Sequence, residues 1–407
     1  MKKLIAVMTA CIMLLTPVTS YGYIKTAKEP SEAGKTMAEL NGYTEEEWAR
    51  LIDDRLEYGE IKELVHLFNP NMDNGWNQID DNARDMQQSV FVLNEARKKT
   101  KETYDESVKQ IQLLPIPEEM KQAEIKKLDS LKTLEKTVGT VAHQYNENYK
   151  KMRSTSSITR GLYSAEDSLT YAVQSLMVAY STVHANVNML QKLADMYNEQ
   201  LNSYKSLKTQ GMATDTDILK AQSDLVSARS NLAKLKTTDQ QLYSQIITMC
   251  GWKGTDKVSI GSIPVPDASR VAAMDPEADA DIAANNNSQI KALHSAKHKN
   301  SSAGLDAYFG KEEELKSYVR ANMQTVYANV IAAQQGVEAA RLGLEAANLN
   351  KKAVDIQFKQ GLLSEPQYLG ASIEKAQKDA AYTGAVNAYE QAILDYEAAL
   401  RGNIEAR

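Results

Sequence analysis

Few residues of this 407-residue chain have the types and spacing that chemistry requires. His294 and His298 are four residues apart, which would place two metal ligands on one face of a helix. No cysteine and no well-placed third carboxylate accompanies them, so the sequence predicts no metal site. Cys250 has no His or Asn pattern around it that would make it a nucleophile, and we expect a buried thiol at a helix end.

Motifs typical of enzymes are also missing from the sequence. It contains no phosphate-binding loop, no Gly-x-Ser-x-Gly elbow and no His-Glu-x-x-His helix, so we expect neither an enzyme nor a bound cofactor. The chain is acidic, with 47 Lys and Arg against 53 Asp and Glu, and it has no basic patch. Nucleic acid is therefore not the expected partner.

Residues 1–22 have the order of an export signal. Lys2 and Lys3 precede an apolar run that ends at Leu15, and small residues near Gly22 suit cleavage. The run is too short to cross a bilayer comfortably, and no later window resembles a membrane helix. Cys11 lies in a stretch that superficially resembles a lipidation box, but the apolar run continues beyond it, which disfavours lipidation. We expect an exported protein of the cell envelope.

Long heptad series dominate the rest of the chain. Apolar residues alternate in steps of four and three from 169 to 204 and again from 218 to 249, with Asp239 as the one polar member. This is the spacing of a coiled-coil seam. The two series are Leu169, Val173, Leu176, Tyr180, Val183, Val187, Leu190, Ala194, Tyr197, Leu201 and Tyr204, then Ile218, Ala221, Leu225, Ala228, Leu232, Leu235, Asp239, Leu242, Ile246 and Met249.

A short segment, 210–217, separates the two series. Gly211 is suited to end the first helix in a left-handed conformation, and Thr214 or Asp215 can cap the second helix through a side-chain oxygen. The pattern predicts an antiparallel helical hairpin with a tight tip.

The same arrangement recurs about 150 residues later. A second seam runs from 319 to 358, with Lys351 as its polar member, and a return helix extends to Leu400. In the connecting segment Gly361 corresponds to Gly211 and Ser364 corresponds to Thr214. Duplication of one long hairpin unit explains this recurrence better than a short-repeat solenoid does.

The expected organisation follows from the two repeats and the one Gly- and Pro-rich linker. It comprises a signal peptide (1–22), an N-terminal extension (23–58), a first hairpin repeat (59–251), a linker (252–274), a second hairpin repeat (275–402) and a C-terminal tail (403–407).

The fold class we expect is all-α, built from duplicated coiled-coil hairpins. Ascending helices over about 165–210 and 316–360 would each be about 65 to 70 Å long, at about 1.5 Å per residue. Hairpins of that length have little core of their own, so they must pack side by side, within and between chains, to cover their seams.

The two tips resemble those of the TolC family of outer-membrane efflux proteins, in which each repeat turns at a Gly followed by an apolar residue, then Ser or Thr and a helix start. The matching stretches are Gly211-Met212-Ala213-Thr214 and Gly361-Leu362-Leu363-Ser364, each followed by a helix. The Asn69-Pro70 turn, its weaker counterpart at 285–287, and Gly251 and Gly402 closing the halves also fit. The resemblance covers about 340 residues, in register twice.

The resemblance implies a homotrimer whose twelve helices form a tunnel, with the tips docked on a periplasmic adaptor and an inner-membrane pump, ABC-type or other. The residues it assigns to docking are Gly211, Met212, Thr214, Gly361, Leu362 and Ser364. Exposed apolar residues at a tip also suit a docking surface, although a hairpin tip with no partner remains an alternative. Asp215, Asp217 and Glu365 could line the tunnel mouth, or could simply stabilise helix N-termini.

One feature of the family is not expected in this chain. Its members carry two β-hairpins per chain for a membrane barrel, whereas the windows 114–165 and 296–311 are Lys- and Glu-rich or too short. The segment from Pro117 to Arg153 should instead add extra helix. We therefore expect a TolC-like helical tunnel without the transmembrane β-barrel, suited to a cell that lacks an outer membrane.

The leading hypothesis is an efflux or export duct component. Its main alternative is a non-transport coiled-coil scaffold of the cell envelope, which would have no need for an internal duplication. A sensory ectodomain is a third option, disfavoured because no second membrane segment follows.

Overall fold

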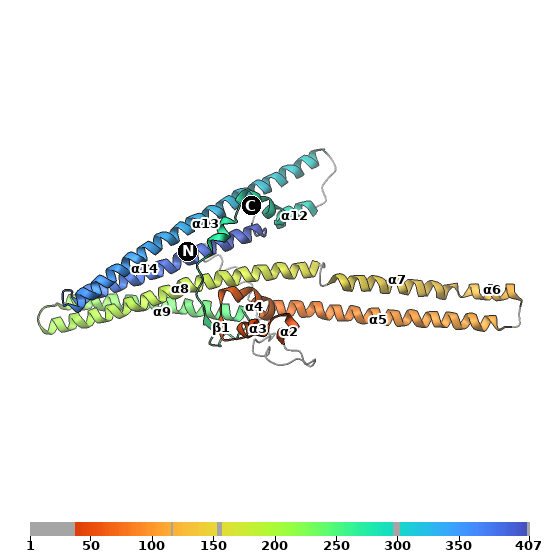
Figure 1. The fold of residues 1–407 in the computed structure, drawn as a ribbon, viewed down its shortest axis with the longest axis horizontal. Coiled ribbons are helices and arrows are strands. Elements are labelled where there is room, and N and C mark those ends of the chain that lie inside the picture. Colours follow the sequence, from red (N-terminus) through yellow and green to blue (C-terminus); the bar gives the residue numbers. More distant parts are fainter. Residues whose placement is uncertain (1–36, 115–116, 153–156, 296–301, 405–407) are drawn as a thin grey trace. The chain divides into compact units, whose positions relative to one another are not determined.

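A computed structural model describes residues 37–114, 117–152, 157–295 and 302–404. The described chain is almost entirely helical, and its strands are the two-residue β1 (Arg55–Leu56) and β2 (Ser259–Ile260) (Figure 1). The prediction of an all-α fold with long helices is confirmed. Two compact units make up the described chain: one covers Val65–Leu169, and the other covers the residues up to Leu64 and those from Thr170 onward.

The first unit contains a hairpin that the heptad analysis did not identify. Helix α5 (Pro70–Gln112) packs antiparallel to α6 (Glu118–Lys127) and α7 (Asp129–Met152). Asn69 caps α5, accepting a hydrogen bond from the Asn71 N–H at 3.0 Å, as the Asn-Pro turn predicted. The extra helical segment expected in this region is therefore present as α6 and α7, and its partner is α5.

The second unit contains the two hairpins that the sequence predicted. Helices α8 (Ser157–Thr209), which lies in this unit from Thr170 onward, and α9 (Asp215–Met249) form the first hairpin, and α13 (Ser302–Lys359) and α14 (Glu365–Leu400) form the second. At about 1.5 Å per residue, the 53 residues of α8 and the 58 of α13 extend about 80 and 87 Å. Both helices exceed the predicted length because they begin earlier, at Ser157 and Ser302.

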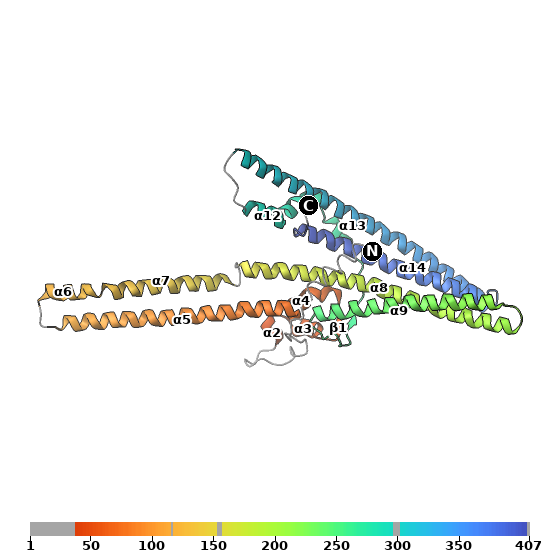
Figure 2. The ribbon, with the colours of Figure 1, turned by 180° about the vertical axis from the view of Figure 1, so that it is seen from behind.

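Neighbouring helices of the second unit form a row in the order α9, α8, α14, α13. Apolar clusters join α8 to α9, and a larger cluster joins α13 to α14. Hydrogen bonds join α8 to α14, among them Tyr171 Oη to Asp395 Oδ1 (2.8 Å) and Asn387 Nδ2 to Thr182 Oγ1 (2.9 Å). The order of the four helices can be followed in Figure 2.

The predicted seams lie between the helices. Every predicted seam residue of α8 and α9 is buried or half-buried. The two polar seam members have partners: His184 Nδ1 and Asp239 Oδ1 are 3.1 Å apart, and Lys351 pairs with Asp355 and lies 4.1 Å above the ring of Tyr368. These partners explain how a carboxylate and an ammonium group are tolerated in apolar seams.

Short elements gather where the hairpins of the second unit begin. Strands β1 and β2 pair in parallel, and Leu56 lies opposite Ile260 of the linker. The other elements are α2 (Met37–Asn41), α3 (Glu45–Leu51), η2 (Tyr58–Glu60), α4 (Ile61–Phe68), α10 (Ala268–Ala272), α11 (Pro276–Asn286) and α12 (Ser288–Ser295). Within the described ranges, none of the helices combines the length and apolar content needed to cross a membrane.

Candidate docking site at the hairpin tips

The first tip turns through a glycine in the left-handed region. Gly211 has φ +75°, and its N–H and that of Met212 donate to Lys208 and Leu207 carbonyl oxygens, both at 2.9 Å. These bonds satisfy carbonyls that the end of α8 would otherwise leave free. Glycine is required here because a Cβ disfavours this backbone conformation.

Thr214, rather than Asp215, caps the next helix. Its hydroxyl accepts a hydrogen bond from the Asp217 N–H at 3.2 Å, and its own N–H donates to Asp217 Oδ2 at 2.9 Å. This reciprocal pair is a capping box. The hydrogen bonds from the Thr214 hydroxyl and backbone lower the pKa of Asp217 below its usual value of 3.8. Asp215 instead pairs with Lys208 across the turn.

The second tip repeats this geometry. Gly361 has φ +72°, and the Leu362 N–H donates to the Gln357 carbonyl at 2.9 Å, as the Met212 N–H does to Leu207. The Ser364 N–H and hydroxyl both donate to Gln367 Oε1 at 2.9 Å. Two tips 150 residues apart thus use the same turn, which supports the internal duplication.

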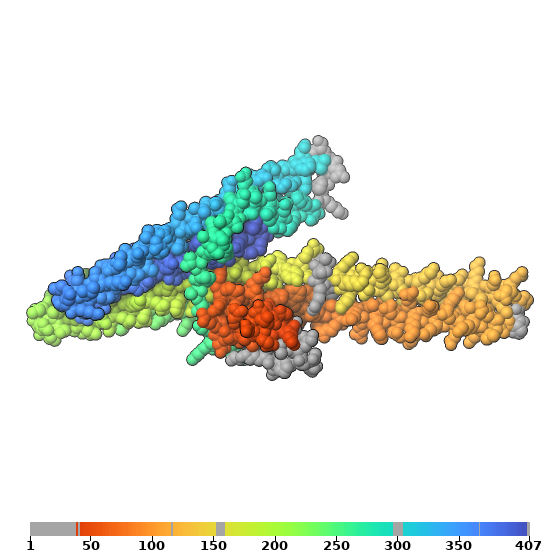
Figure 3. All heavy atoms as spheres, viewed as in Figure 1, coloured from red at the N-terminus to blue at the C-terminus, as the bar shows by residue number. Residues whose placement is uncertain are grey.

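Each tip exposes one large apolar side chain that the turn itself does not need. Met212 is 74% exposed and Leu362 is 68% exposed. Both tips lie at the same end of the second unit, where the ends of the two hairpins emerge together in the space-filling view (Figure 3). Exposed apolar side chains on two ordered turns would suit a contact surface, and the docking role of the tips stays a prediction.

The acidic residues of the tips have different local roles. Asp217 belongs to the capping box, Asp215 forms an ion pair, and Glu365 begins α14, where a carboxylate is favoured by the helix dipole. These roles agree with the simpler of the two interpretations of the sequence. A role of the three carboxylates at a tunnel mouth stays a prediction.

The capping box should make the first turn of α9 sensitive to acid. Because the folded-state pKa of Asp217 is lowered, its stabilising effect is present above its usual value near 3.8 and is lost as the pH falls through the lowered value. Amide hydrogen exchange, corrected for its intrinsic pH dependence, should show this turn opening as the pH falls below the usual pKa of an aspartate. In the variant Asp217→Asn, amide exchange in this turn should not change as the pH is lowered. An equal acid response in the natural protein and in the variant would contradict the role assigned to Asp217.

The other residues that could do chemistry have structural environments. His294 Nε2 lies 3.3 Å from Glu312 Oε1, and His298 lies outside the described residues. Cys250 is fully buried at the end of α9, as predicted, and burial raises its pKa well above the usual range of a thiol. In the described part of the chain, no three His, Cys, Asp or Glu residues are grouped as metal ligands would be.

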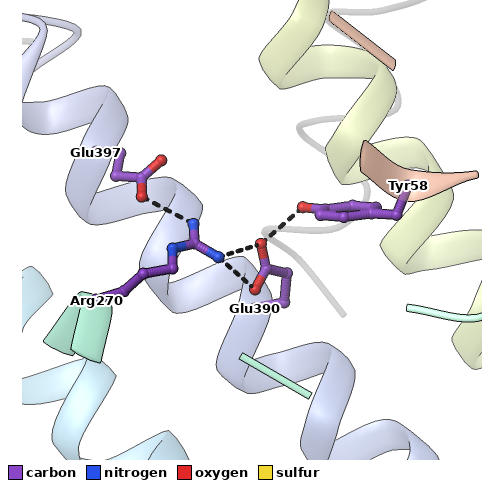
Figure 4. Close-up of polar contacts among 4 residues, drawn as sticks. All are labelled: Tyr58, Arg270, Glu390 and Glu397. Atoms are coloured by element: carbon purple, nitrogen blue, oxygen red, sulfur yellow. Dashed lines mark hydrogen bonds and ion pairs between the residues drawn. The ribbon is translucent and has the colours of Figure 1, made fainter. Parts of the chain in front are cut away.

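A buried carboxylate holds three segments of the second unit together (Figure 4). Glu390 of α14 is only 1% exposed, and it accepts hydrogen bonds from Arg270 Nη1 (3.1 Å to each oxygen) and from the Tyr58 hydroxyl (2.9 Å). Arg270 Nη2 also donates to Glu397 Oε1 at 2.8 Å. The sequence analysis missed this cluster because its members are far apart in the chain and match no motif.

The sequence analysis also missed a second apolar stripe on α13. Six exposed residues follow one another in alternating steps of three and four, on the face opposite the seam that packs on α14. They are Ala339, Leu342, Ala346, Leu349, Ala353 and Ile356. The spacing of this outer stripe of α13 is visible in the sequence as a heptad pattern. The seam that packs on α14 is more strongly apolar and was the only pattern recognised in this helix.

Helix α9, at the other edge of the row, has a comparable outer stripe. It consists of exposed, uncharged residues spaced by four and three: Leu219, Ser223, Val226, Ser230, Ala233 and Thr237. Leu219 and Val226 are 64% and 61% exposed. Both edges of the four-helix row therefore present exposed, uncharged stripes at heptad spacing with no partner in the described chain, and the α13 stripe is the more apolar of the two.

The chain is similar to known proteins in fold alone. No family model matches the chain, and no curated protein matches it. Among solved structures it is similar to CusC, whose structure is described in terms of folding and transmembrane channel formation. The two sequences are 13% identical, the match covers 84% of this chain and 96% of CusC, and the TM-score is 0.43. The match to the outer-membrane channel OprN has 12% identity, covers 87% of this chain and 92% of OprN, and has a TM-score of 0.40. The match to the outer-membrane channel CmeC of Campylobacter jejuni has 11% identity, covers 64% of this chain and 68% of CmeC, and has a TM-score of 0.37.

The structural search thus returns channels of the TolC type that the tips resemble. At TM-scores below 0.5, these likenesses carry no conclusion about what the chain does. The function proposed below depends on the chain's own seams, stripes and tips.

Proposed function

We propose that this protein is a component of a TolC-like efflux or export duct, in which several copies pack edge to edge around a helical tunnel. The observation that carries this proposal is the outer stripe of α13 (339–356), an exposed heptad surface opposite the seam of its own hairpin. An isolated hairpin has no use for two opposed seams, whereas a helix within a closed ring contacts a neighbour on each side.

The two edges of the row are different surfaces, which favours a ring. Joining the outer stripe of α13 in one copy to that of α9 in the next gives a head-to-tail contact, and such contacts close into a ring when the rotation between copies permits it. With the four helices of this row from each copy, three copies supply the twelve helices that the family resemblance implies. The proposed assembly is therefore a homotrimer.

The proposed setting is the cell envelope. The N-terminal signal pattern of residues 1–22 supports export. The acidic character of the chain argues against a nucleic-acid partner. In this setting the exposed Met212 and Leu362 would contact an adaptor protein, which in turn connects the duct to an ABC-type or other pump. No catalytic role or cofactor is part of the proposal.

Leu349→Asp should abolish assembly. Each contact between copies would then bury an unpaired carboxylate, at a cost of about 3 kcal/mol or more, which weakens association by at least about 100-fold. Light scattering of the mature chain should give a trimer mass for the natural protein and a monomer mass for the variant. The control is Lys352→Asp. This side chain lies about a quarter-turn around the helix from the middle of the stripe, so the variant should still assemble.

Electron microscopy down the axis of the natural assembly decides between the duct and its alternative. A ring with a hollow centre supports the duct. A natural protein that is monomeric, or that forms solid bundles, would contradict it and favour the coiled-coil scaffold.

Leu362→Asp should weaken adaptor binding while leaving assembly intact. The side chain is exposed at the tip, so the substitution costs little folding stability, but an apolar contact with the adaptor would be replaced by a buried charge. Quantitative pull-down of a cognate adaptor should fall by about tenfold or more. Phe91→Asp is the control, since Phe91 of α5 is an equally exposed apolar residue (67%) that belongs to the first unit and to neither tip. Equal binding by both variants would count against docking through the tips.

A further inference from the structure

A cavity of about 430 Å³ lies where α8, α13 and α14 of the second unit meet. This volume falls within the range of small-molecule sites in proteins. Its polar lining includes Tyr171 of α8, Tyr318 and Asn322 of α13, and Asp395 of α14. It is far from the hairpin tips along α14, because Asp395 is 30 residues, or about 45 Å of helix, from Glu365.

Asp395 is held in place by neutral donors. Its Oδ1 accepts hydrogen bonds from the Tyr171 hydroxyl (2.8 Å) and from Gln391 Nε2 (2.7 Å). No ion pair neutralises it among the residues that the structure describes, and none of the residues lining the cavity is basic. A half-buried carboxylate in this setting leaves a negative charge facing the cavity.

Two aromatic side chains belong to the same lining, one from each flanking helix. Burial and the adjacent Asp395 raise the pKa of Tyr171 well above its usual range, so the phenol stays protonated and keeps donating to the carboxylate. Tyr318, from α13, has no hydrogen-bond partner in the described chain and is 37% exposed. The faces of tyrosine rings attract cations, and the attraction grows as the cation loses water.

Apolar side chains form part of the remaining lining, beside the polar Asn403. Val326 of α13 and Ile404, after α14, contribute to it, and both belong to or pack against the main apolar cluster of the second hairpin. An apolar wall favours a ligand that carries methyl or methylene groups beside its charge. A hydrated metal ion would gain nothing from such a wall.

We propose that this cavity binds a small organic cation, a quaternary or alkylated amine, with its charge beside Asp395 and its apolar groups between the tyrosines and Val326. The site is independent of assembly and of the docking tips, so it extends beyond the proposed duct function.

Titration calorimetry of the full mature chain with choline tests the proposal, and 3,3-dimethylbutan-1-ol serves as the uncharged probe of the same shape. Choline should bind saturably, with a Kd of about 1 mM or tighter, as one carboxylate and two aromatic contacts permit. The alcohol should bind at least about tenfold more weakly, because it gains neither the ionic nor the cation–π attraction. No saturable binding of choline, or equal binding of the two probes, would overturn the proposal.

Variants locate the binding within the cavity. Asp395→Asn should lose at least about tenfold in choline affinity, and Asp379→Asn, which changes a carboxylate 16 residues away on α14, should lose none. Tyr318→Leu keeps the Asp395 hydrogen bonds and should weaken choline about threefold, which keeps the test valid if Asp395→Asn folds poorly. Unchanged affinity in folded Asp395→Asn or in Tyr318→Leu would refute this location.

Discussion

Replacing Arg270 with methionine is expected to lower the free energy of unfolding by about 3 kcal/mol. Arg270 donates to both oxygens of Glu390 at 3.1 Å, and Glu390 is only 1% exposed. Methionine keeps much of the aliphatic stem but removes the charge. The buried carboxylate would then retain a single neutral donor, the Tyr58 hydroxyl at 2.9 Å.

The expected cost lies at the low end of the range for breaking buried ion pairs. Arg270 is itself about one third exposed, so water can partly replace it beside Glu390. The neighbouring Tyr58 stays protonated and keeps donating to Glu390, since burial and the Glu390 charge raise its pKa well above the usual range. The loss should be concentrated where η2, α10 and α14 meet.

The matched control is Arg341→Met. Arg341 also contacts two carboxylates, Glu338 (2.8 Å) and Glu345 (3.3 Å), but all three side chains are exposed. Removing it should change stability very little, because exposed ion pairs on one helix are weak. Urea unfolding at one fixed protein concentration measures both variants, since assembly also stabilises the fold. Similar midpoints for the two variants would show that the Glu390 cluster does not stabilise the fold in this way.

Gly402→Ala is expected to destabilise the second hairpin by about 2 to 5 kcal/mol. The loss has two causes: a left-handed backbone conformation that alanine disfavours, and a steric clash of the new Cβ with neighbouring backbone. Gly402 has φ +89°, and a Cβ there would lie 2.5 Å from the carbonyl carbon and oxygen of Asn286 and 2.8 Å from the Asn287 nitrogen. Those atoms are backbone and cannot move aside as a flexible side chain would. The thermal midpoint should fall by several degrees or more.

The contact at Gly402 joins the two ends of the second repeat. Asn287 Nδ2 donates to the Ile404 carbonyl at 2.8 Å, and Asn286 Nδ2 donates to the Leu400 carbonyl at 3.1 Å. The Asn-rich turn and the closing glycine, which the sequence showed as separate signatures, are therefore one packed structure. A bulkier residue at Gly402 should separate them.

Gly211→Ala separates the two causes. Gly211 has a similar φ of +75°, but nothing lies within 4 Å of where its Cβ would be. Only the backbone penalty applies, so the expected loss is about 1 kcal/mol, confined to the tip. If both glycine variants lost the same stability, the close approach to Asn286 would not be the cause of the larger effect.

Much of the fold was predictable because its signals are local. Heptad spacing from 169 to 204 identified a helix and the face it buries, and Gly211 and Gly361 identified the turns. The alternatives at the first tip, Thr214 or Asp215 as the cap, needed the structure, because both residue types can cap a helix. The structure shows Thr214 accepting from the Asp217 N–H and Asp215 paired with Lys208.

The hairpin of the first unit shows where local signals weaken. Helix α5 buries only Met72 and Ile79, and the rest of its packing face is half-buried and mixed in polarity. A thin seam of this kind has little periodic contrast, so the sequence indicated helix around 117–153 without indicating that it pairs with α5.

By itself, the sequence determined the helical class, the two long hairpins, their glycine tips and the absence of a catalytic motif, because periodicity and turn chemistry involve residues within a few positions of one another. Only the tertiary structure decided that Glu390 is buried against Arg270 and Tyr58, that Asp395 faces a cavity between tyrosines of two helices, and that the outer stripes of α9 and α13 lie at the two edges of one row. These features depend on which residues more than 100 positions apart come into contact, and packing of whole helices, rather than the preference of any single segment, sets those contacts.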